Sequence, residues 1–151
     1  MKFPLRLAYL AATCYNVFED VFSPAAKPES TDSFRLFPAM MMFRHAVELI
    51  LKAIIRDVLK AHPPTNTHKV SDIFEQHVRG NLQGTLGDDE QFVSDALREL
   101  QDADPGDAFR FGFDKNGLPY FQNMPESVDA RKVFDVCERL WGALWRVHGP
   151  V

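Results

Sequence analysis

A stripe of charged residues crosses one otherwise apolar segment of this chain. Arg44, Glu48 and Lys52 recur at every fourth position, so on a helix they lie one above another on the same face. His45 lies beside this row, three positions before Glu48. A helix that is apolar on nearly all other sides belongs in the middle of a bundle, where a charge is costly unless it is paired. The stripe therefore predicts either a buried structural ion pair, Arg44 with Glu48, or part of a polar site.

The polar-site interpretation leads to a pocket for a phosphate group. His68 lies near the expected start of a helix, where backbone N–H groups attract anions, and Arg44 and His45 would line the same pocket. Arg110 lies between two phenylalanines and would stack on a nucleic-acid base. His68 and Arg110 also have interpretations that involve no ligand. His68 would simply be solvated, and Arg110 would form an ion pair with a neighbouring aspartate.

Apolar residues at helical spacing define the elements that would position these groups. A β-hairpin-like insert is expected where Phe109, Phe111 and Phe113 alternate with other residues before an Asn116-Gly117 turn. Residues 23–33 are polar and contain proline, which predicts a mobile loop. The helices are expected at about 5–22, at about 36–61 before Pro63-Pro64, from the Thr65–Thr67 cap to Gly80, from Asp88-Asp89 to Pro105-Gly106, and at 127–148.

These elements predict an all-α fold, an up-and-down bundle of four to five helices with the short insert before the last helix. A length of 151 residues fits one domain spanning 1–151. The formal net charge of −4 argues against a protein whose whole surface binds nucleic acid, although it leaves room for a local basic site.

Cysteine usage and missing motifs exclude several classes of function. Cys14 and Cys137 fall in no metal or redox spacing, which predicts a cytoplasmic protein. No stretch reaches the ~20 apolar residues of a membrane span, so no membrane contact is expected. The sequence has no phosphate-binding glycine loop, no Ser/His/Asp order and no paired metal ligands. We therefore expect no metal and no cofactor.

Three segments together resemble the HEPN superfamily of small bacterial helical domains. They are the helix segment 44–52, the His68-Lys69-Val70 start of the next helix, and Phe109-Arg110-Phe111 before the last helix. Many HEPN proteins are metal-independent ribonucleases marked by an arginine, four to six residues and a histidine, often with a polar residue after the arginine. Arg56 and His62 fit this motif, with Asp57 in the polar position.

The resemblance implies that Arg56 and His62 are the catalytic pair. Histidine has the intrinsic pKa for proton transfer, and arginine holds a phosphate bidentately. One histidine is not enough for both proton transfers, so a homodimer would have to bring two motifs together. The motif lies at the end of the second helix, whereas it is usually found on a later helix in the family. A structural interpretation is also open, because cations are favoured at helix C-termini.

Two functions follow from these expectations. In the first, the chain acts on or binds RNA, as a metal-independent endoribonuclease of a toxin–antitoxin or defence system, with an antitoxin as a protein partner. In the alternative, it is a non-catalytic HEPN-like interaction module that docks a protein partner such as a nucleotidyltransferase. In both, the large apolar side chains of Met40–Met42 and of Trp141 and Trp145 predict a homodimer. The two tryptophans are four positions apart and are expected to belong either to the core or to the dimer surface.

Overall fold

The computed structural model describes residues 6–22, 30–103 and 127–150. Its helices are α1 (Leu7–Phe22), α2 (Ser33–Ala53), α3 (Val70–Ile73), α4 (Asp89–Ala103) and α6 (Ala130–His148). A π-helical turn, Ile54–Val58, continues α2, while α3 continues into a second π turn, Phe74–Val78, and a 3₁₀ turn, Arg79–Asn81. The strands β1 (Ser30–Asp32) and β2 (Ser127–Asp129) are short. Helices dominate the described residues, so the predicted all-α class is confirmed.

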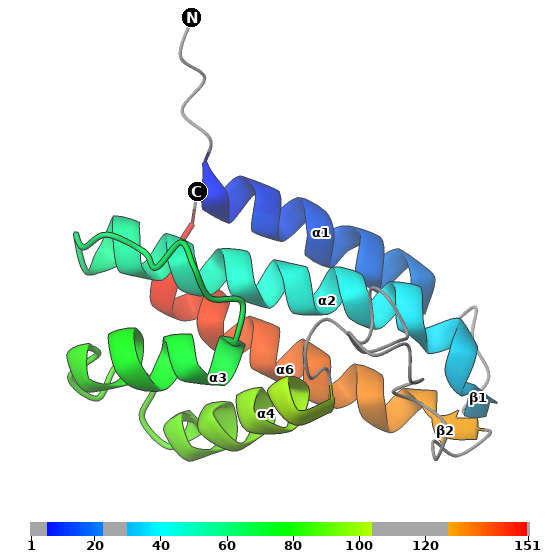
Figure 1. Ribbon diagram of the computed structural model, residues 1–151. Helices are drawn as coiled ribbons and strands as arrows, with labels where there is room; N and C mark the ends of the chain where they lie inside the picture. The colour runs from blue at the N-terminus through cyan, green and yellow to red at the C-terminus, as the bar shows by residue number, and fades with distance from the viewer. Residues whose placement is uncertain (1–5, 23–29, 104–126, 151) are drawn as a thin grey trace, which may run out of the picture.

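Helix α2 is the central element, as its apolar composition predicts. It contacts α1, α3 and α6, and α4 packs against α3 and α6. Figure 1 shows α1 along one side of α2, with α3 and α4 on the other side. Because neighbours cover it on several sides, α2 buries side chains around most of its circumference, and these are Ala39, Phe43, Ala46, Val47, Ile50, Leu51 and Ala53.

Aromatic side chains join the first helix to the last. Tyr15 of α1 stacks on Trp141 of α6, with ring centroids 4.5 Å apart and an interplanar angle of 8°. Phe18 of α1 lies 6.0 Å from Phe134 of α6, and Trp141 stacks in turn on Trp145. The two tryptophans were expected to belong either to the core or to a dimer surface. Trp141 belongs to the core, because its side chain is buried against α1.

The strand pair fixes where α2 and α6 begin. Strand β1 pairs antiparallel with β2, with Ser30 opposite Asp129 and Asp32 opposite Ser127. Helix α2 follows β1 directly, and α6 follows β2 directly. Two boundaries expected from the sequence are therefore wrong. The end of the loop expected at 23–33 forms β1 and the first residue of α2, and the helix expected from 127 begins at Ala130 after a strand.

The end of the second helix also differs from the prediction. The helix was expected to run to Ala61 and to stop at the proline pair, but its π turn ends at Val58. Lys60 has a left-handed backbone with φ 56°, and the Ala61 N–H donates to the Ile55 carbonyl at 2.9 Å. A left-handed residue next to a backbone hydrogen bond that spans six positions is a common way for a helix to end. The backbone has already left the helix before the two prolines are reached.

Two other predictions have different outcomes. The amphipathic pattern of α4 is confirmed, because Val93, Ala96, Leu97 and Leu100 are all buried. The hairpin-like insert with Phe109, Phe111 and Phe113 lies outside the described residues, as do residues 23–29 of the predicted loop.

Candidate functional site

Glu48 is the centre of a polar cluster between α2 and the start of α3. Its side chain is only 6% exposed. Lys52 Nζ donates to Glu48 Oε1 at 2.8 Å, and His68 Nδ1 lies 2.8 Å from the same oxygen. Arg44 Nη1 lies 3.7 Å from Oε2, and Arg44 Nη2 donates to the His68 carbonyl oxygen at 2.6 Å. One buried carboxylate therefore faces two basic side chains of its own helix and one histidine from beyond it.

This cluster keeps Glu48 ionised and holds the connection after α2 in place. Burial by itself raises the pKa of Glu48, but the hydrogen bonds from Lys52 and His68 outweigh it and lower the pKa below its ordinary value. His68 is bound through both its ring and its backbone carbonyl. The segment between Leu59 and Lys69 is therefore fixed to α2 at its far end.

The structure brings together three of the five residues expected in the polar pocket. Arg44, Glu48 and His68 meet, and Arg44–Glu48 is an ion pair as expected. His45 is exposed on α2 and is not among the residues that bond Glu48, so its place in that pocket stays a prediction. Arg110 lies outside the described residues. The hydrogen bond from Lys52 to Glu48 was not predicted, although residues four positions apart on a helix commonly form such a pair.

A second polar cluster lies at the end of the same helix. Arg56 Nε donates to Asp57 Oδ1 at 2.8 Å, and Arg56 Nη2 reaches Asp57 Oδ2 at 3.4 Å. His148, at the end of α6, places Nε2 3.0 Å from Asp57 Oδ2. The hydrogen bond from the adjacent Arg56 guanidinium, with that from His148, lowers the pKa of Asp57 below its ordinary value despite partial burial. Asp57 is 35% exposed whereas Glu48 is 6% exposed, so solvent reaches the carboxylate of this cluster and is largely excluded from that of the first.

The π turn explains how neighbouring residues share this site. A π turn has more residues per turn than an α-helix, so successive side chains diverge less around the axis. Arg56 and Asp57 both lie in the turn Ile54–Val58, whose following Leu59 N–H donates to the Ile54 carbonyl at 3.0 Å. Single π turns inside α-helices are often found at functional sites.

The histidine at Asp57 is not the one predicted for this site, His62. His62 is exposed in the segment after the π turn, between Lys60 and the start of α3. The histidine that bonds Asp57 is His148. No sequence signal could have found this contact, because Asp57 and His148 are 91 positions apart.

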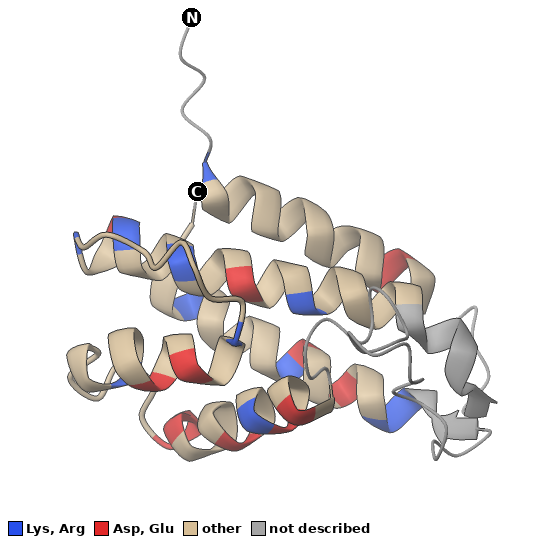
Figure 2. Ribbon diagram, viewed as in Figure 1, with Lys and Arg blue, Asp and Glu red and all other residues tan. Residues whose placement is uncertain are grey.

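The charged residues of α2 and of its connection to α3 form a basic edge, residues 44–69. Its acidic residues are Glu48 and Asp57, whereas its basic residues are Arg44, Lys52, Arg56, Lys60 and Lys69, so its formal net charge is +3 in a chain of net charge −4. Figure 2 shows Lys and Arg on α2 and at both ends of its connection to α3. This edge also carries three of the five histidines, at positions 45, 62 and 68. Arg44 and Lys52 are only 12% and 14% exposed and pair with Glu48. The cations of this edge that solvent reaches are therefore Arg56, Lys60 and Lys69, and exposed cations attract phosphate groups.

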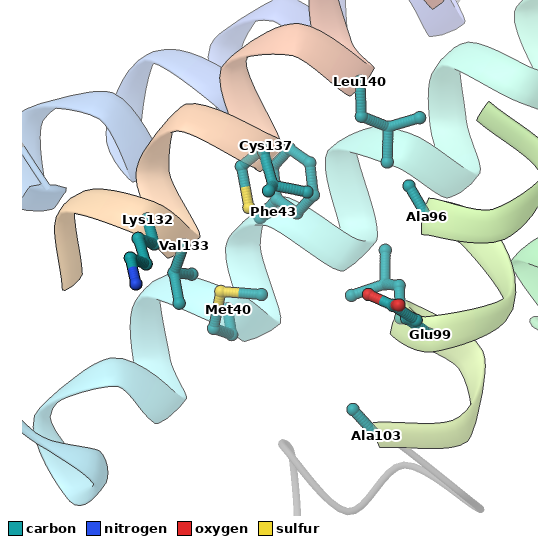
Figure 3. A pocket seen from close by; sticks show the side chains of 11 residues that line it. Met40, Phe43, Ala96, Glu99, Ala103, Lys132, Val133, Cys137 and Leu140 are labelled. Carbon is teal, nitrogen blue, oxygen red and sulfur yellow. The ribbon is translucent and has the colours of Figure 1, made fainter. Parts of the chain in front are cut away.

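An apolar cavity of about 350 Å³ lies between α2, α4 and α6. Figure 3 shows Met40 and Phe43 of α2 facing Cys137 and Leu140 of α6, with Glu99 and Lys132 as the two charged side chains that line it. Cys137 is buried and its thiol is free, and burial raises its pKa well above its ordinary value. The cavity therefore offers apolar contact and no reactive thiolate.

Comparison with protein-family models, with curated proteins and with solved structures finds no match to this chain. Within residues 6–22, 30–103 and 127–150, no helix has both the length and the apolar character that crossing a membrane requires. The same described residues contain no group of three His, Cys, Asp or Glu side chains placed to hold a metal ion.

Proposed function

We propose that this protein is a HEPN-like up-and-down helical bundle that binds RNA along the basic edge and cleaves it without metal at Arg56 and His62. The observation that carries the proposal is the charge of this edge, net +3 in an otherwise acidic chain, with His62 exposed on it. Phosphate-binding surfaces need such a local excess of Lys and Arg. The histidine supplies the proton transfer that RNA cleavage requires.

The reaction uses the ribose as its own nucleophile. His62 removes the proton from the 2′-hydroxyl, and the 2′-oxygen then forms a bond to the adjacent phosphorus. The bond from phosphorus to the 5′-oxygen of the next nucleotide breaks, leaving a 2′,3′-cyclic phosphate and a 5′-hydroxyl. Arg56 stabilises the negative charge on the phosphorane, and the leaving 5′-oxygen takes a proton from a general acid.

The general acid comes from a second copy of the chain in this proposal. His148 does not serve, because its side chain is 8% exposed and both ring nitrogens already face oxygen acceptors. A homodimer that places two basic edges together supplies the second His62. Light scattering tests this step, and a monomer mass at concentrations where RNA is cleaved would exclude the shared site.

Cleavage of single-stranded RNA in EDTA is the direct experiment. The wild type is expected to leave cyclic phosphate ends, and His62→Ala is expected to abolish cleavage with little change in melting temperature, since His62 is exposed. Arg56→Ala is expected to slow cleavage and to reduce the salt slope of RNA binding by about 1. In a toxin–antitoxin or defence setting, expression of the wild type would arrest bacterial growth, and His62→Ala would relieve that arrest.

Two variants away from the basic edge serve as controls. His77→Ala removes a histidine from the π turn Phe74–Val78, and Arg98→Ala removes an exposed cation from α4. Both are expected to cleave RNA like the wild type. Equal cleavage by the wild type and by His62→Ala, or none by either, would show that the spacing of Arg56 and His62 is coincidental.

The apolar cavity favours a second candidate function, a non-catalytic interaction module that docks a protein partner such as a nucleotidyltransferase. Apolar pockets of this size accept a large side chain from a partner. Val136 lines the cavity and is exposed, so Val136→Glu would block docking with little effect on folding. If Val136→Glu cleaves RNA like the wild type, the cavity has no part in cleavage at the basic edge. If the wild type does not cleave RNA, docking is the preferred function.

A further inference from the structure

His148 makes several contacts at the end of α6. It is the last residue of α6, and Gly149 follows with φ 82°, the left-handed conformation that commonly ends a helix. Its Nδ1 lies 2.8 Å from the Gly149 carbonyl oxygen, and its ring stacks on Trp145 with centroids 6.1 Å apart. The contacts with Gly149 and Trp145 therefore fix the orientation of the imidazole ring that bonds Asp57.

The two hydrogen bonds of His148 define its chemistry at this position. Nδ1 faces a carbonyl oxygen and Nε2 faces the Asp57 carboxylate, and both of these groups are acceptors. A ring nitrogen must carry a proton to donate to an acceptor, so both bonds form together when both nitrogens are protonated. In that form His148 makes a charge-assisted hydrogen bond to Asp57, which is the stronger kind.

Asp57 links the fixed ring of His148 to the guanidinium of Arg56. Its Oδ1 accepts from Arg56 Nε, and its Oδ2 accepts from both Arg56 Nη2 and His148 Nε2. A bidentate contact of this kind fixes the plane of the guanidinium as well as its position. Asp57 and Arg56 are each more than a third exposed, whereas His148 is buried, so the fixed point of the three is the histidine on α6.

We infer that His148 is a positioning residue for Arg56 and acts through Asp57, with the end of α6 aiming the guanidinium at the phosphate. The inference rests on the proposed function, because it assigns Arg56 the role of binding the phosphorane. A group that stabilises a transition state must be held in place before the reaction. Residue 148 supplies that restraint across the interface between α2 and α6.

A double-mutant cycle on single-turnover RNA cleavage tests the inference. His148→Leu is expected to slow the cleavage step on the order of tenfold, because a misplaced transition-state contact lowers the rate. RNA affinity is expected to change little, since the basic edge remains. In the Asp57→Asn background the same substitution is expected to have almost no further effect, because the path to Arg56 is already broken.

Conservative and matched variants separate positioning from folding. His148→Gln keeps an N–H donor for Asp57 and is expected to recover part of the rate. Arg146 lies in the same turn of α6 as His148 but forms an ion pair with Asp89. Arg146→Leu is therefore expected to leave the cleavage step unchanged. If His148→Leu fails to fold, the comparison of His148→Gln with the wild type still measures the dependence on this contact.

The outcomes distinguish this inference from the proposed function. A wild type that does not cleave RNA overturns both. A wild type that cleaves, with His148→Leu cleaving at the same rate, overturns the positioning role alone. If His148→Leu lowers the cleavage rate equally in the wild-type and Asp57→Asn backgrounds, His148 acts on stability or by another path. That result also overturns the inference.

Discussion

Glu48 and Asp57 are carboxylates on one continuous helix, and each binds a histidine from another part of the chain. The carboxylate of Glu48 is buried, and its two closest partners, Lys52 and the more exposed His68, lie 2.8 Å from one oxygen. The cluster at Asp57 is partly exposed, lies in a π turn and includes the arginine of the candidate site. A carboxylate that binds a histidine therefore anchors the fold where the carboxylate is buried, at Glu48, and is available for chemistry where the carboxylate is partly exposed, at Asp57.

Removing the buried carboxylate should produce the largest effect. Glu48→Ala is expected to lower the free energy of unfolding by about 3 kcal/mol, because Arg44 and Lys52 would stay largely buried without their counter-charge. Urea denaturation measures the loss. A change of less than about 0.5 kcal/mol, the range of ordinary surface substitutions, would mean that the cluster at Glu48 behaves like an exposed one.

Removing one of its partners should cost less. Lys52→Ala is expected to destabilise the protein by about 1 kcal/mol, since Glu48 keeps the hydrogen bond from His68 and the ion pair with Arg44. The same denaturation series compares Lys52→Ala with Glu48→Ala. Equal losses in the two variants would show that Lys52 alone compensates the buried charge.

The pH dependence should follow the lowered pKa of Glu48. A carboxyl group with a folded pKa below its ordinary value of 4.5 contributes stability above that pH, and the contribution is lost as pH falls through the folded value. Glu48→Gln removes this titration. The stability difference between wild type and Glu48→Gln is therefore expected to be largest near about pH 7 and to narrow towards about pH 3. Denaturation at several pH values tests it, and a constant difference would contradict the ionised state of Glu48.

The open cluster should show the smallest effect on stability. Asp57→Asn keeps an oxygen acceptor for His148, and Asp57 is partly exposed, so the free energy of unfolding is expected to change by no more than about 0.5 kcal/mol. Thermal and urea denaturation measure this change. A loss comparable with that of Glu48→Ala would remove the distinction between the two clusters.

Much of the helical framework could be predicted because helices are local. The buried residues Val93, Ala96, Leu97 and Leu100 recur at helical spacing, and so do Val70, Ile73, Phe74 and Val78 of the α3 segment. The spacing of Arg44 and Glu48 also predicted an ion pair within one helix. In each case the pattern and the interaction lie within a few residues of one another.

The remaining features depend on distant partners. Ser127–Asp129 forms a strand because Ser30–Asp32 pairs with it, and no local pattern distinguishes it from the first turn of a helix. Lys60 adopts a left-handed backbone although it is not a glycine, so the end of the second helix was placed too late. The contact of His148 with Asp57 depends on α6 ending beside α2. Each of these features is set by tertiary packing.

The aromatic stack between α1 and α6 gives this protein a built-in optical reporter. Trp141 and Trp145 are the chain's two tryptophans, and both belong to the stack that starts at Tyr15 and continues to the ring of His148. Ultraviolet-excited emission therefore comes from one small region of the molecule, beside the residue that bonds Asp57. Because Trp145 stacks on the ring of His148, the brightness of the unlabelled protein will respond to changes in packing at the end of α6.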